Sequence, residues 1–75
     1  MNEKLRKILS NVFETDIDKI NEESSPDTIE KWDSVHHLYM IMAIEEGFNI
    51  RLTDEETMQL VNCRMIELIL KEKGI

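Results

Sequence analysis

The residues of this chain that could do chemistry gather around Ser34. Asp33 precedes this serine, and two histidines, His36 and His37, follow it closely. An acidic residue before a serine is typical of a helix start, where free backbone N–H groups and the macrodipole favour negative charge. A serine in that place is well positioned to carry a phosphoester. The same two residues, taken alone, are also what an ordinary helix cap looks like.

Two other kinds of chemistry are conceivable here, and both are disfavoured. Ser34 and His37 would be neighbours on a helix, as a nucleophile and its base must be, but no oxyanion motif or orienting group accompanies them. His36 and His37 are adjacent, so their side chains diverge by about 100° on a helix and do not close on one metal ion. We therefore expect neither an enzyme nor a metal site, and we interpret His37 as a packed or hydrogen-bonding residue.

Length and charge narrow the class of protein. The chain has 75 residues, with 9 basic and 16 acidic side chains and a formal net charge of −7. We expect one small domain over residues 1–75 that repels nucleic acid and favours basic protein surfaces as partners. The single cysteine, Cys63, has no intramolecular disulfide partner. No apolar run is long enough to span a membrane and the start does not resemble a signal peptide, so we expect a cytoplasmic monomer.

The hydrophobic pattern predicts an all-α fold with three main helices and one short helix. Apolar residues recur at helical spacing over about 2–14, 33–49 and 62–73. A capping box formed by Thr53 and Glu56 starts the short helix. This pattern predicts a small helical bundle with a long loop after its first helix.

The long loop and the short helix are both expected to contribute to the core. The loop covers residues 15–33, and four isolated apolar residues are expected to anchor it: Ile17, Ile20, Ile29 and Trp32. The short helix is expected to contribute Met58 and Leu60. Gly47, near the end of the second main helix, is interpreted as part of its stop region.

The second main helix has two apolar stripes instead of one. The first stripe comprises His37, Met40, Ile41, Ile44 and Phe48. The second lies roughly opposite, comprises Val35, Tyr39, Met42 and Glu46, and is bordered by Glu45. A helix in so small a bundle is hardly buried all round, so one stripe either faces solvent and partners or is covered by the short helix. Periodicity leaves both alternatives open.

Residues 33–56 (D-S-V-H-H-L-Y-M-I-M-A-I-E-E-G-F-N-I-R-L-T-D-E-E) resemble the acyl carrier protein family. In that family the segment runs from Asp-Ser-Leu through an apolar helix ending in Ala-Leu-Glu-Glu-x-Phe, and then into Pro-Asp-Glu-Glu. The length, acidity and helix order of the whole chain are similar as well. The resemblance implies the fold of that family, with its long loop between the first two main helices.

The resemblance also implies a function. Ser34 matches the serine that receives 4′-phosphopantetheine from coenzyme A, through a phosphopantetheinyl transferase, and Asp33 matches the acid before it. Acyl or aminoacyl intermediates of a pathway such as fatty acid or polyketide biosynthesis would be carried on this arm as thioesters. Acyl-loading and acyl-processing enzymes with basic or mixed surfaces would be the other partners. The partner-facing side implied by the resemblance comprises Val35, His36, Tyr39, Met42, Glu45 and Glu46.

The chain also departs from the fatty-acid members of that family. His36 and Tyr39 stand where those carriers usually have acids, and Thr53 replaces the usual proline. The W-D-S-x-x-H pattern from Trp32 to His37 is more similar to stand-alone carriers of specialised pathways. The alternative from another class is a small helical module that binds a partner through the Val35 stripe and is never modified.

Overall fold

The computed structural model describes all 75 residues, and helices are its only regular secondary structure. The elements in chain order are α1 (Glu3–Phe13), the 3-10 turn η1 (Ile17–Lys19), α2 (Ser34–Phe48), α3 (Asp54–Met58) and α4 (Cys63–Glu72). The prediction of three main helices and one short helix is confirmed. None of these helices combines the length and the apolar character that crossing a lipid bilayer requires.

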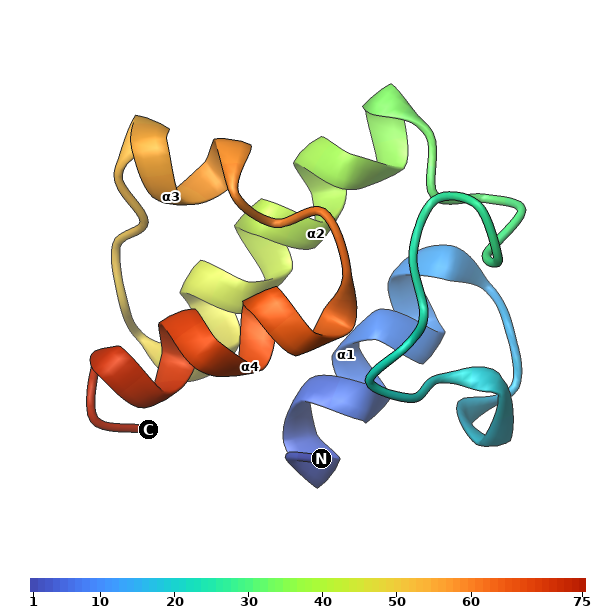
Figure 1. The fold of residues 1–75 in the computed structure, drawn as a ribbon, viewed down its shortest axis with the longest axis horizontal. Coiled ribbons are helices and arrows are strands. Elements are labelled where there is room, and N and C mark those ends of the chain that lie inside the picture. The colour runs from blue at the N-terminus through green and yellow to red at the C-terminus, as the bar shows by residue number, and fades with distance from the viewer.

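The helices are arranged around α2, which runs diagonally through the molecule (Figure 1). In that view α1 and α4 lie in the lower half, α3 lies at the upper left, and both chain ends lie at the bottom. The start of α2 is at the top, far from both ends of the chain. The long loop crosses back towards the start of α4 before it rises to α2, so it contacts more than one helix.

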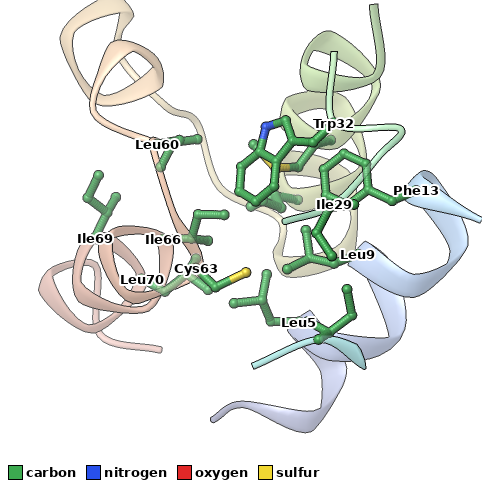
Figure 2. Close-up of a cluster of buried hydrophobic side chains, with 13 residues drawn as sticks. Leu5, Leu9, Phe13, Ile29, Trp32, Leu60, Cys63, Ile66, Ile69 and Leu70 are labelled. Atoms are coloured by element: carbon green, nitrogen blue, oxygen red, sulfur yellow. The ribbon is translucent and has the colours of Figure 1, made fainter. Parts of the chain in front are cut away.

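One hydrophobic core holds these elements together. Side chains from α1, the loop, α2 and α4 converge in it (Figure 2). Three of the four predicted loop anchors, Ile20, Ile29 and Trp32, are buried, whereas Ile17 is only partly buried. The Trp32 indole stacks on Phe13, with 4.8 Å between the ring centroids. The other buried apolar residues are Leu5, Leu9, Met40, Ile44, Leu60, Cys63, Ile66, Ile69 and Leu70.

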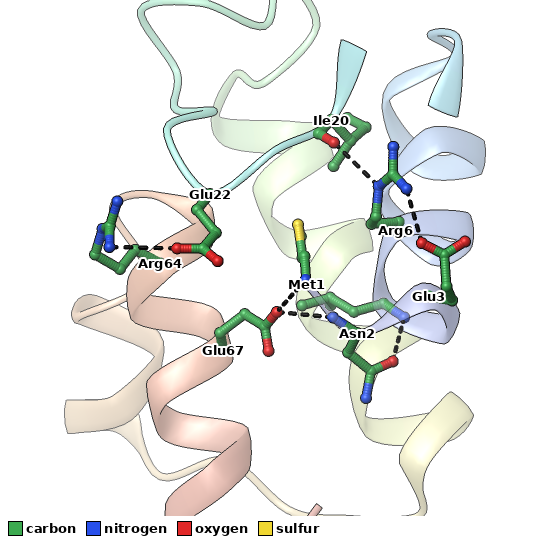
Figure 3. Close-up of polar contacts among 9 residues, drawn as sticks. Met1, Asn2, Glu3, Arg6, Ile20, Glu22, Arg64 and Glu67 are labelled. Atoms are coloured by element: carbon green, nitrogen blue, oxygen red, sulfur yellow. Dashed lines mark hydrogen bonds and ion pairs between the residues drawn. The ribbon is translucent and has the colours of Figure 1, made fainter. Parts of the chain in front are cut away.

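Polar contacts fix the loop on two sides. The Arg6 guanidinium donates to the carbonyl oxygen of Ile20 at 3.1 Å (Figure 3). It also donates to the carbonyl oxygen of Ile17 at 2.9 Å, and so holds the loop against α1. At the other side the backbone N–H of Cys63 donates to the Ser24 carbonyl at 2.9 Å, and that of Arg64 donates to the Glu22 carbonyl at 3.1 Å. These bonds satisfy backbone donors in the first turn of α4, which have no partner within the helix.

The end of α2 lies in the stop region expected from Gly47 to Asn49. The helix continues through Gly47 to Phe48, and Asn49 ends it in the left-handed conformation at φ 54°. Asparagine tolerates this conformation better than most residues do. Gly47 is instead a place of close helix packing, because a Cβ there would lie 2.7 Å from Cδ1 of Ile8 on α1.

The prediction that Met58 of the short helix contributes to the core is wrong. The Met58 side chain is 79% exposed, whereas Leu60 is buried as expected. Helix α3 ends at Met58, so Leu60 lies beyond it and reaches the core from the following turn. A helix of five residues presents only about one turn to its neighbours, and spacing alone does not place its few apolar residues.

The Cys63 thiol should be inert in the folded protein. Its burial, reinforced by the Glu67 carboxylate, raises the pKa of this thiol to about 12. A free thiol has a pKa of about 8.5, so the protonated Cys63 thiol contributes its full share to the stability of the folded state below that pH. This contribution is lost as the pH rises towards 12. We expect an aromatic disulfide reagent at neutral pH to label native Cys63 at least about tenfold more slowly than the urea-unfolded chain. Equal labelling rates would contradict this prediction, and Cys63→Ala provides the blank.

Candidate functional site

The structure places Ser34 at the surface, as the first residue of α2. Asp33 immediately precedes it as the N-cap, and its Oδ1 accepts a hydrogen bond from the backbone N–H of His36 at 2.8 Å. This bond explains why the helix begins here, since the cap satisfies a backbone donor that the first turn leaves free. The serine hydroxyl is therefore presented at the positive end of a 15-residue helix.

The carboxylate of Asp33 is bound a second time by the neighbouring histidine. Nδ1 of His36 lies 2.8 Å from the same Oδ1, and the ring stands edge-on to Tyr39. The backbone bond from His36, followed by the bond from its ring, lowers the pKa of the Asp33 carboxyl. Glu14, at the end of α1, lies on the other side of this histidine, with Oε2 4.0 Å from Nε2, and pairs with Lys31 at 3.2 Å. The acids next to Ser34 are thus engaged within the protein.

His37 joins three parts of the chain. The Trp32 indole N–H donates to Nδ1 of His37 at 3.0 Å, and Nε2 of His37 lies 3.4 Å from the Thr57 carbonyl oxygen. Because Nδ1 accepts, the neutral ring carries its proton on Nε2 and donates it to Thr57. The bonds connect the loop, α2 and α3, and they confirm the interpretation of His37 as a hydrogen-bonding residue. They also occupy both ring nitrogens, which leaves His37 unsuited to act as a base for Ser34.

An open groove of about 490 Å³ adjoins the serine. It lies between the first half of α2 and the α3 region, and most of its surface is apolar. Its lining includes Ser34, Leu38, Ile41, Met58, Leu60 and Val61. A flexible group attached at Ser34 could lay an apolar segment along this groove and remove it from water.

The second apolar stripe of α2 faces outward, which resolves the ambiguity left by periodicity. Val35 is 53% exposed, Tyr39 53% and Met42 64%, so α3 does not cover them. On the first stripe, Met40 and Ile44 are buried and Ile41 and Phe48 pack against the core, partly buried. Sequence reasoning missed Leu38, which is 60% exposed. Its position three residues after Val35, on the same face of a helix, was the available signal.

The two glutamates at the end of α2 differ in their surroundings. Oε2 of Glu45 accepts a hydrogen bond from the backbone N–H of Leu52 at 2.8 Å, and the residue is partly buried. Glu46 is exposed. Glu45 therefore holds the turn that leads from α2 to α3, whereas the exposed Glu46 does not take part in that contact.

This difference predicts unequal effects of charge reversal. Glu45→Lys should lower the free energy of unfolding by about 1–3 kcal/mol, because it leaves the Leu52 N–H without its acceptor. Glu46→Lys should change it by no more than about 0.5 kcal/mol. Urea unfolding of the two variants measures both values. Glu45→Gln is the matched control, since its amide oxygen can still accept the bond. Equal stability of the two Lys variants would argue against a structural role for Glu45.

No group of three histidine, cysteine or acidic side chains is arranged as a metal ion would require. Comparison with known proteins adds no assignment. No protein-family model matches this chain, and no curated protein matches it significantly. Any function must therefore be argued from the residues around Ser34.

Proposed function

We propose that this protein is a carrier of the acyl carrier protein type, with 4′-phosphopantetheine attached to Ser34. The observation that carries the proposal is the place of Ser34: exposed, in the first turn of a long helix, directly after an acidic cap, and beside an apolar groove. It is supported by the sequence of residues 33–56, which places the serine within the pattern of that family. The protein itself would not be an enzyme.

The residues of the chain fit such a group. The start of α2 favours the negative charge of a phosphodiester at Ser34, and the groove offers apolar surface to the arm and to the beginning of its cargo. When attached, the group supplies a terminal thiol that holds acyl or aminoacyl intermediates as thioesters. Cys63 does not compete with that thiol, because it is buried and its pKa is raised to about 12.

The protein would act by tethering. A cargo bound to one small partner meets successive enzymes at high effective concentration, without release between steps. The partners would be a phosphopantetheinyl transferase, which uses coenzyme A, and the enzymes that load and process the cargo. The histidines and aromatic groups around Ser34 favour a specialised pathway over bulk fatty-acid synthesis, in a cytoplasmic, monomeric carrier.

Intact mass measurement tests the proposal. The purified chain is incubated with a broad-specificity phosphopantetheinyl transferase, coenzyme A and Mg²⁺, and we expect a single increment of one phosphopantetheine per chain. The product should also gain one thiol that reacts rapidly at neutral pH, unlike Cys63. An unchanged mass, with an authentic carrier modified in parallel, would refute the proposal. It would favour the second candidate, an unmodified helical interaction module, for which the exposed stripe of α2 is the supporting observation.

A further inference from the structure

We propose that His37 is an acid-sensitive latch for the groove beside Ser34: when its ring takes up a proton from solvent, the bond from Trp32 is lost and the groove wall opens between the two side chains. The role of the latch in regulating the groove rests on the proposed function, because the group that would lie there is the arm attached to Ser34. The response to pH itself depends only on contacts within the unmodified chain.

The latch residues form part of the groove wall. Trp32, His37 and Thr57 all line the groove, together with Ser34. The indole N–H of Trp32 donates to Nδ1 of His37 at 3.0 Å, and Nε2 of His37 lies 3.4 Å from the Thr57 carbonyl oxygen. A separation of the indole from the imidazole would therefore change the shape of the surface next to the serine.

Only the neutral imidazole fits between these two partners. Nδ1 accepts the bond from Trp32 and so carries no proton, whereas a protonated ring has an N–H at both nitrogens. Two donors would then face each other across 3.0 Å, at an indole that is 4% exposed. The indole is stacked on Phe13 in the core, and His37 is only half-buried, so the imidazole is the group that can move. The conflict is relieved when this ring turns away from Trp32 towards solvent.

Helix α3 is able to follow the ring. The protonated imidazole can still donate from Nε2 to Thr57, and a hydrogen bond from a charged donor is stronger than one from a neutral donor. The five-residue helix α3 has no buried residue, and Leu60, which reaches the core, lies beyond its end. Its Glu56 pairs with Lys73 at 3.0 Å, but both side chains are partly exposed. A segment with so few buried contacts opens at a low cost in free energy.

No acidic side chain compensates a charged ring in the closed position. No carboxylate oxygen lies within 4.0 Å of the His37 ring nitrogens. The charged groups of the surrounding elements are Asp33 and His36 at the start of α2, which bond each other, Glu14 at the end of α1 and Lys31 in the loop, which pair with each other, and Asp54, Glu55 and Glu56 of α3. A fall in pH therefore shifts the population from the closed form towards forms in which the ring is free to take up a proton.

Urea unfolding of the unmodified chain at two pH values tests the latch. Histidine side chains change charge between about pH 5 and pH 8, so a ring that stays neutral in the closed form should raise the unfolding equilibrium constant by up to about tenfold between about pH 7.5 and about pH 5.5. His37→Gln corrects for all other titrating groups, because its amide can replace both hydrogen bonds but does not titrate. We expect the acid-induced rise of the wild type to exceed that of His37→Gln by about five- to tenfold.

The adjacent histidine provides the matched control. His36 is bonded to Asp33 and not to Trp32. The same factor of about five to ten should therefore separate His36→Gln from the double variant His36→Gln/His37→Gln. Equal acid responses of His36→Gln and the double variant would overturn the assignment to His37.

Trp32 is the only tryptophan of the chain, so its indole N–H gives a single NMR signal that reports the bond directly. Between about pH 7.5 and about pH 5.5 this signal should shift in the wild type and in His36→Gln, and it should stay in place in His37→Gln. Should His37→Gln not fold, Trp32→Phe removes the opposing donor instead and should lower the acid-induced rise of the unfolding constant equally.

An indole signal that does not respond to pH in the folded wild type would overturn the inference, as would an acid response that persists in folded His37→Gln or Trp32→Phe. Either result leaves the proposed function intact, because attachment at Ser34 is measured separately by intact mass. An unmodified Ser34 in a chain whose latch responds to pH would overturn the proposed function alone.

Discussion

Ser34→Ala is expected to abolish attachment of phosphopantetheine completely while leaving the fold intact. The hydroxyl is the group that would form the phosphoester, and no other residue can replace it in the first turn of α2. Ser34 is exposed, so its replacement should change the free energy of unfolding by no more than about 0.5 kcal/mol. Intact mass after incubation with transferase and coenzyme A measures the first effect, and urea unfolding measures the second.

The loop provides the matched control for this experiment. Ser25→Ala removes a partly buried hydroxyl that is not at the start of a long helix, and it should be modified at the wild-type rate. Ser24 is less suitable because it is buried; the hydroxyls of both serines accept a backbone hydrogen bond, from Asn21 and from Asp27 respectively. A mass increment that persists in Ser34→Ala, or that disappears in a folded Ser25→Ala, would show that the attachment site is misassigned.

Trp32→Ala is expected to be the most damaging single change near the site. The indole is 4% exposed, stacks on Phe13 and donates to His37, so its loss opens a cavity and releases the bond between the loop and α2. Truncation of a buried aromatic residue costs about 3–5 kcal/mol. A chain of this length has a total stability of only about 4–11 kcal/mol. We expect a large fall in the urea midpoint and slower modification of Ser34.

Trp32→Phe separates the two contributions of the indole. Phenylalanine retains much of the stacking on Phe13 but cannot donate to His37, and it should cost no more than about 2 kcal/mol. Hydrogen exchange should then show faster opening at the start of α2 and around Thr57, because His37 has lost one of its two partners. A Trp32→Ala variant as stable as wild type would contradict the role assigned to this residue in the core.

The sequence by itself determined the helices and the place of the serine. Local interactions govern both: apolar residues at helical spacing define α1 and α4, and Asp33, Thr53 and Asn62 cap the helices that follow them. The loop anchors were also predictable, because isolated apolar residues in a long polar segment of a small domain can avoid water mainly by packing into the core. Ser34 could be singled out because its neighbours form a recognisable pattern.

Only the tertiary structure decided what lies against each face of a helix and which polar side chains are bonded within the protein. Periodicity showed two apolar stripes on α2, but which of them is covered depends on where α1 and α4 pack, and so it could not predict that Val35 and Met42 are exposed. The sequence did not show that Glu45 and Glu46 have different roles, because the hydrogen-bond partner of Glu45 is a backbone N–H seven residues further along the chain. The bonds of His37 to Trp32 and Thr57 likewise depend on the loop and α3 meeting at one ring. Contacts between segments distant in sequence leave no periodic signal, since they arise from the packing of complete elements against each other.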